Sequence, residues 1–193
     1  MLYPYARRVP PRPPCALDGW IGPGWRLLER HAIDVEAPPP AAVAALAGLR
    51  IRELPTVRAL FALRGLGARP DATLREFFST APFVLLDEGG AELVGGVLLP
   101  AREGEARARR VPRSPVEFER ALARAPFAAV ATFRADARMG GAGLWTETWV
   151  RTRGPAAAAT FAAYWLAVGP FSAWIRRMFL REARRRAEGG RPG

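Results

Sequence analysis

The chain carries no charged residue between Arg153 and Arg176, and six arginines follow closely behind. A run of this length could cross a bilayer, or it could be a helix that packs inside a folded protein. On a helical wheel Phe161 and Trp165 fall on one apolar stripe, and the opposite face is largely alanine and then arginine. A lipid-facing helix needs large apolar side chains all round, and Pro170 interrupts this run. The pattern predicts a helix laid across a sheet, not a membrane anchor.

Composition places the chain among globular proteins. Its 193 residues suffice for one domain with a sizeable core, and 50% of them are hydrophobic. The formal net charge is +11, yet all 29 basic residues are arginine, and the sequence contains no lysine, asparagine or glutamine. We interpret this profile chiefly as the product of GC-rich coding. A nucleic-acid or phospholipid partner is the alternative explanation of the positive charge.

The N-terminal residues indicate the compartment and the domain boundaries. Cys15 is the only cysteine, which excludes an internal disulfide framework and favours a reducing compartment. The first residues lack the apolar segment of a secretory signal, so we expect a cytoplasmic protein. Residues 1–24 are rich in proline and glycine and predict an extended arm. The folded domain is expected over residues 25–189, with a short tail at 190–193.

Apolar periodicity predicts the first half of this domain. Alternation around His31 predicts a strand, and two short helices are expected after it, over 41–49 and over 54–65, where Gly65 ends the second. Two apolar runs that flank a turn at residues 87–90 predict a hairpin. The Gly95–Gly96 pair inside its second run predicts a bulge or a close approach of the backbone to another group.

The second half of the domain is expected to complete an antiparallel sheet. A charged loop and a short helical turn precede two strands, over 128–136 and 144–152. Gly154 and Pro155 then open the longest helix. Strands grouped together with helices at the ends are typical of an α+β fold, and only the last helix is long enough to cover the sheet.

Two segments carry a resemblance to a known family. HAIDVEAPPPAAVAAL (31–46) resembles the opening strand and helix of the START/SRPBCC superfamily, the helix-grip fold of polyketide cyclase/dehydrase-like proteins. LWTETWVRT (144–152) and FAAYWLAVGPFSAWIRRMFLREARRRAE (161–188) resemble the last strand and long helix of an uncharacterised bacterial branch of that superfamily. The resemblance covers residues 25–189. It implies a curved antiparallel sheet wrapped around the C-terminal helix, with an apolar pocket between them.

Strand parity assigns the residues that would line such a pocket. Arg134, Glu147 and Arg151 mark the outer face of the last two strands, so the alternate residues should face the helix. Trp145 and Trp149 would then project outward, toward a partner or the N-terminal arm. A close-packed interior without a pocket is the alternative. The predicted ligand-binding residues are Phe133, Thr146, Thr148, Phe161, Tyr164, Trp165 and Val168.

The sequence contains no recognisable catalytic motif. His31 is its only histidine; if it points inward it is a weak candidate for a general base, and a structural histidine is the favoured interpretation. Neither a metal-ligand spacing nor a phosphate-binding or dinucleotide-binding loop is recognisable, so no metal and no cofactor are expected. Whether the protein is an enzyme is left open, and a non-enzymatic role is favoured.

We therefore expect a binding protein for a hydrophobic, lipid-like or polyketide-like small molecule in a pocket between the sheet and the C-terminal helix. The first alternative is a cyclase-type or dehydratase-type enzyme that uses the same pocket. The second is a peripheral protein attracted to anionic membranes by Arg176, Arg177, Arg181 and Arg184. Without interleaved aromatic side chains, the arginine clusters do not resemble a nucleic-acid platform. The sequence does not indicate the oligomeric state.

Overall fold

The computed structural model describes residues 13–63, 69–80, 82–99 and 111–189. A five-stranded antiparallel sheet forms its centre, in the order β1-β5-β4-β3-β2. The strands are β1 (Trp25–Val35), β2 (Phe83–Gly89), β3 (Glu92–Leu99), β4 (Phe127–Arg138) and β5 (Gly141–Thr152). The helices are η1 (Ala16–Gly19), α1 (Pro39–Ala47), η2 (Ile51–Glu53), α2 (Pro55–Leu63), α3 (Leu74–Phe78), α5 (Pro115–Leu122) and α6 (Pro155–Ala187). The predicted α+β class, with an antiparallel sheet and a long C-terminal helix, is confirmed.

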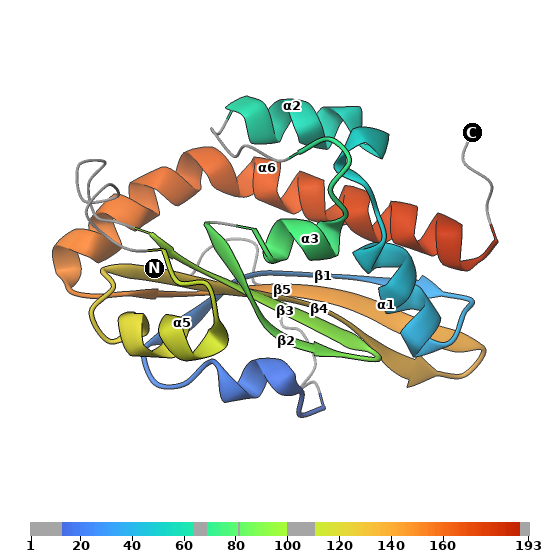
Figure 1. The fold of residues 1–193 in the computed structure, drawn as a ribbon, viewed down its shortest axis with the longest axis horizontal. Helices are drawn as coiled ribbons and strands as arrows, with labels where there is room; N and C mark the ends of the chain where they lie inside the picture. Colours follow the sequence, from blue (N-terminus) through green and yellow to red (C-terminus); the bar gives the residue numbers. More distant parts are fainter. Residues whose placement is uncertain (1–12, 64–68, 81, 100–110, 190–193) are drawn as a thin grey trace.

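Helices cover both faces of this sheet (Figure 1). α6 and α1 contact each other and, together with α3, pack on one face, which we call the inner face. α5 and η1 pack on the opposite face, the outer face. The helix expected over 54–65 is α2, whereas its predicted end at Gly65 lies outside the described residues. The sequence predicted the cover of the inner face by α6, but it did not predict α3 or η1.

The chain path brings α6 back across the inner face. β4 and β5 form a long hairpin that pairs without interruption from Phe127 and Thr152 to Arg138 and Gly141. β1 pairs with the far side of β5, so the first and last strands are neighbours in the sheet. α6 follows β5 almost directly and arches across the sheet toward α1 (Figure 1). The first and last elements of the domain therefore meet.

Glycine and proline set the start of α6. Gly154 has a φ of 83°, a conformation that favours glycine, and Pro155 occupies the first helical turn, where its missing N–H costs no hydrogen bond. The helix continues through Pro170 for 33 residues and contributes buried residues such as Phe161 and Phe179 to the core. By length and composition alone α6 could cross a membrane. Its packing on the sheet agrees with the prediction of a helix within a folded domain.

The Gly95–Gly96 pair lies where two aromatic rings approach β3 from opposite faces. A Cβ on Gly95 would lie 2.2 Å from the ring of Phe78, and one on Gly96 would lie 2.8 Å from the ring of Phe118. The pairing of β2 with β3 also shifts register next to this point. The close approach predicted for the glycine pair is confirmed, because neither ring leaves room for a side chain.

We expect Gly96→Ala to lower the free energy of unfolding by about 2 kcal/mol, because the ring of Phe118 is fully buried and cannot move aside. Gly89→Ala is the matched control, since a Cβ at that position would meet no atom within 4 Å and the φ of Gly89 is ordinary. Urea denaturation of both variants measures the difference. Equal stability of the two variants would contradict this account of the glycine pair.

Candidate functional site

A cavity lies between the inner face of the sheet, α6, and the segment that runs from α2 to β2. Its volume is about 370 Å³, which is within the range of small-molecule pockets. Nearly all of its wall is apolar, and aromatic rings dominate it. These rings belong to Phe61, Phe77, Phe78, Phe83, Phe133, Phe161, Tyr164, Trp165 and Phe179. The side chains under α6 therefore leave open space and do not fill the interior completely.

Most of the residues predicted to bind a ligand lie on this wall. They are Phe133, Thr148, Phe161, Tyr164, Trp165 and Val168. Thr146 also faces α6 but does not line the cavity. Its hydroxyl accepts a hydrogen bond from Arg176 at 2.6 Å. Strand parity placed the sheet residues well because β4 and β5 pair without a bulge. That these residues bind a ligand stays a prediction.

Sequence reasoning missed the part of the wall that comes from α2, α3 and the start of β2. The missed residues include Phe61, Leu74, Phe77, Pro82 and Phe83. Phe77 is central to this part, because its ring stacks on Phe61 at 4.9 Å and packs on Phe83 at 4.6 Å. A signal for α3 was present in the sequence. Thr73 and Glu76 form a capping box, in which each side chain accepts a hydrogen bond from the other residue's N–H.

One side of the cavity is polar. Thr148, Ser172 and Arg176 line it, and all three hydrogen-bond to Glu29, whose side chain is 3% exposed. Its Oε1 accepts hydrogen bonds from the hydroxyl of Ser172 at 2.6 Å, from Nε of Arg176 at 3.1 Å and from the hydroxyl of Thr148 at 3.3 Å. Its Oε2 lies 3.2 Å from Nε2 of His31. A buried carboxylate is tolerated only when it is paired and hydrogen-bonded, and here both conditions hold.

A β-bulge in β1 brings Glu29 into this position. The register of β1 against β5 shifts between Leu27 and Glu29, so that both Leu28 and Glu29 face α6. Leu28 packs on the apolar side of the cavity, and Glu29 meets α6 one residue later. The alternation around His31 also places Glu29 inward, but the expected strand pattern began only at His31, so the polar cluster was missed.

The surroundings of Glu29 keep its carboxyl group ionised. Burial by itself would raise the pKa of Glu29. The hydrogen bond with His31, the positive charge of Arg176 and the hydrogen bond from Ser172 together outweigh burial, and the pKa of Glu29 lies below its ordinary value. The cluster therefore holds a carboxylate and a guanidinium side by side at neutral pH.

The side chains of His31 and Arg176 both form hydrogen bonds inside the protein. The ring of His31 is bonded to Glu29 and does not line the cavity, so the geometry supports a structural histidine more than a general base. The guanidinium of Arg176 bonds to Glu29 and Thr146 and lies 5.4 Å from the ring of Phe133. The membrane alternative groups Arg176 with Arg177, Arg181 and Arg184, and the inward position of Arg176 removes it from that group. Within the described part of the chain, no group of His, Cys, Asp and Glu side chains could hold a metal ion.

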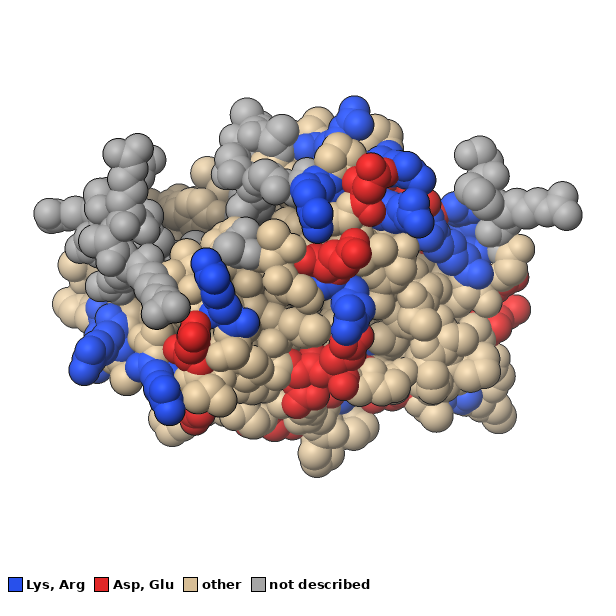
Figure 2. Space-filling view, viewed as in Figure 1, with Lys and Arg blue, Asp and Glu red and all other residues tan. Residues whose placement is uncertain are grey.

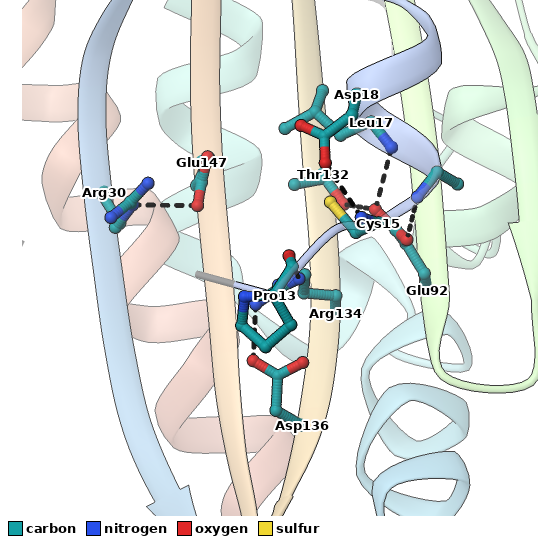
Figure 3. A network of polar contacts seen from close by, with 11 residues as sticks. Pro13, Cys15, Leu17, Asp18, Arg30, Glu92, Thr132, Arg134, Asp136 and Glu147 are labelled. Atoms are coloured by element: carbon teal, nitrogen blue, oxygen red, sulfur yellow. Dashed lines mark hydrogen bonds and ion pairs between the residues drawn. The ribbon is translucent and has the colours of Figure 1, made fainter. Parts of the chain in front are cut away.

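The outer face of the sheet holds a second polar network, which fixes the N-terminal segment (Figure 3). The carboxylate of Glu92 accepts hydrogen bonds from the backbone N–H groups of Ala16 and Leu17, at 2.8 and 3.3 Å. It also accepts one from the hydroxyl of Thr132 at 3.0 Å. Leu17 is fully buried in an apolar cluster with Phe118 on this face. Residues from 13 onward are thus folded against the sheet.

Two of the three residues predicted to mark the outer face, Arg134 and Glu147, are buried there, and the N-terminal segment covers Arg134. Arg134 lies on that face but is only 3% exposed, and its guanidinium donates to the carbonyl of Pro13 (Figure 3). Glu147 forms an ion pair with Arg30 at 2.8 Å and accepts a hydrogen bond from the indole of Trp149. Trp149 packs against the same apolar cluster as η1. Trp149 was expected to be covered either by a partner or by the N-terminal arm, and the structure shows it covered by the N-terminal segment.

Compared with protein-family models and with curated proteins, the chain gives no match. Membership of the START/SRPBCC superfamily therefore stays a prediction. The coarser architecture does not depend on that resemblance, since the five-stranded sheet and the long C-terminal helix are present.

We expect Glu29→Gln to lower the free energy of unfolding by about 3 kcal/mol at neutral pH, because it removes the buried carboxylate that forms an ion pair with Arg176. The double variant Glu29→Gln with Arg176→Met should recover part of this loss, because both members of the ion pair are then uncharged. Urea denaturation of the two variants checks both statements. A double variant less stable than the single one would contradict them.

The cost of Glu29→Gln should also depend on pH. The pKa of Glu29 is lower in the folded protein than in the unfolded chain, so the carboxylate stabilises the fold above the ordinary value of 4.5. This contribution is lost as the pH falls through the folded-state pKa. The stability difference between wild type and Glu29→Gln should therefore shrink below that pH, and a difference that grows toward acid would contradict the assignment.

Proposed function

We propose that this protein binds a hydrophobic, lipid-like or polyketide-like small molecule in the cavity between the sheet and α6. The cavity itself carries the proposal. Close packing is the default of protein interiors, whereas here about 370 Å³ of open space lies among aromatic rings. A site of this size with an apolar wall is suited to an apolar molecule, whose burial removes hydrocarbon surface from water.

The polar side of the cavity supports a ligand with one polar end. Thr148, Ser172 and Arg176 line the cavity, and each also bonds to Glu29. The carboxylate holds these side chains in fixed positions, so that hydroxyl and guanidinium groups border the cavity at one place. The hydroxyl groups of Thr148 and Ser172 already donate to Glu29, so their free lone pairs can accept a hydrogen bond from a ligand, while the rest of the wall offers only apolar contacts.

The layout of the fold supports the same proposal. In the helix-grip proteins that the sequence resembles, the ligand lies between an antiparallel sheet and the C-terminal helix, and this cavity has the corresponding position. A START/SRPBCC-type fold and a cytoplasmic location are part of the proposal. The cyclase-type or dehydratase-type alternative has less support, because the ring of His31 is hydrogen-bonded to Glu29 and does not line the cavity.

The test is a variant that fills the cavity without touching the surface. Ala131 lies on β4 with its side chain on the cavity wall, so Ala131→Phe places a ring in the open space. We expect this variant to bind 11-(dansylamino)undecanoic acid, a fluorescent fatty acid, at least roughly tenfold more weakly than wild type, because the space is occupied. Fluorescence titration measures both affinities.

Ala123→Phe is the matched control for this experiment. Ala123 is exposed at the end of α5, on the side of the sheet opposite the cavity, so the same substitution there should leave binding unchanged. Circular dichroism shows whether both variants keep the fold. Equal affinity of the folded Ala131→Phe and Ala123→Phe variants would contradict the cavity as the binding site.

A further inference from the structure

Exposed large apolar side chains gather on α6. Within the described residues, four of the seven lie on this helix: Tyr164, Leu166, Phe171 and Trp174. Leu166 is 75% exposed, Phe171 47% and Trp174 43%. The outer face of this helix was expected to be largely alanine, and this expectation missed Phe171 and Trp174. A contiguous apolar patch on a folded domain marks an interaction surface.

The exposed residues Leu166, Phe171 and Trp174 share one side of the helix. Together with the exposed Ala163, Ala167 and Pro170 they follow the three- and four-residue spacing of neighbours along one helix face. Buried residues such as Trp165 and Ile175 lie on the opposite side, against the sheet. We call this surface the outer stripe; it consists of Ala163, Leu166, Ala167, Pro170, Phe171 and Trp174.

The same side of the helix becomes basic after Trp174. Arg177 and Arg181 continue the outer stripe and are exposed, and no described carboxylate pairs with either of them. The next arginines differ, because they pair with carboxylates of α6, of its C-cap residue or of η2. These pairs are Arg184 with Glu188, Arg185 with Glu182, and Arg186 with Glu182 and Glu53. Figure 2 shows basic side chains gathered over this C-terminal end of α6.

We infer that the outer stripe, together with Arg177 and Arg181, docks on the surface of an anionic phospholipid membrane. A bilayer surface offers an acyl-chain boundary next to phosphate groups, and this helix face offers apolar side chains next to exposed guanidinium groups. Tryptophan is favoured at that boundary, and arginine suits phosphate because its fork donates two parallel hydrogen bonds. The charges match as well, since the chain has a formal net charge of +11.

The packing of α6 makes this contact peripheral. Ile175, Phe179 and Leu180 are buried in the main core, so the helix cannot turn its inner side to lipid without unfolding that core. Only the outer stripe is available, and it lies along the membrane plane. Tyr164 borders the stripe, is 40% exposed and also lines the cavity, so a docked protein holds the edge of its cavity at the membrane. The inference goes beyond ligand binding and does not rest on it.

The experiment is co-sedimentation of the full chain with phosphatidylcholine vesicles, made with or without phosphatidylserine. We expect binding to the vesicles that contain phosphatidylserine, weakened at high salt because exposed charges are screened. Arg177→Gln with Arg181→Gln should weaken this binding by roughly tenfold or more. Leu166→Gln with Trp174→Gln should weaken it to a similar degree, by roughly tenfold, because apolar contact is lost.

The matched control is Val116→Gln with Met139→Gln. Both positions are exposed and apolar, and they lie on α5 and at the β4–β5 turn, away from α6. This variant should bind vesicles as wild type does. Equal binding by the control and the two α6 variants, or no sedimentation of wild type with phosphatidylserine vesicles, would overturn the inference.

Two further measurements separate this inference from its competitors. Sedimentation velocity without vesicles tests a second copy as the occupant. A dimer that Leu166→Gln with Trp174→Gln converts to a monomer, without a change in vesicle binding, would overturn the membrane assignment. Titration of the same variants with 11-(dansylamino)undecanoic acid reports on the cavity independently, so loss of docking and loss of ligand binding are distinguishable.

Discussion

The ion pair between Glu29 and Arg176 joins the two ends of the domain. Glu29 belongs to the first strand and Arg176 to the last helix, and these elements meet across 147 positions of sequence. Because a buried carboxylate needs donors on both oxygens, Ser172 and His31 are also drawn into this junction. The pair therefore defines where α6 lies on the sheet, and with it the shape of the space beneath the helix.

The cavity follows from the way the apolar residues are distributed around this junction. Beyond Ser172 toward its N-terminus, α6 contacts the sheet through large rings such as Phe161 and Trp165, while between Phe127 and Phe133 the cavity-facing residues of β4 are the small Ala129 and Ala131. Large side chains opposite small ones could interdigitate, yet here they leave open space. Toward its C-terminus the same helix packs closely with α1. One helix thus provides both a packed core and a cavity wall.

Periodicity and parity predicted the strands β4 and β5, the helix α6 and the part of the cavity wall that these elements provide, because they are long and regular. The polar cluster was missed, since the expected alternation began only at His31 and hydrogen bonds between distant residues leave no local pattern. α3 has only five residues, too few for a helical period. η1 is ordered by tertiary contacts with Glu92 and the outer apolar cluster, which no property of residues 13–20 reveals alone.

The central claim is that the space under α6 holds a hydrophobic molecule, and native mass spectrometry tests it most directly. The protein would be purified without detergent and measured intact and after denaturation. The account predicts an adduct of defined mass that is present on the folded protein and lost when the protein unfolds. Only the bare chain mass, even after incubation with a total lipid extract, would contradict it.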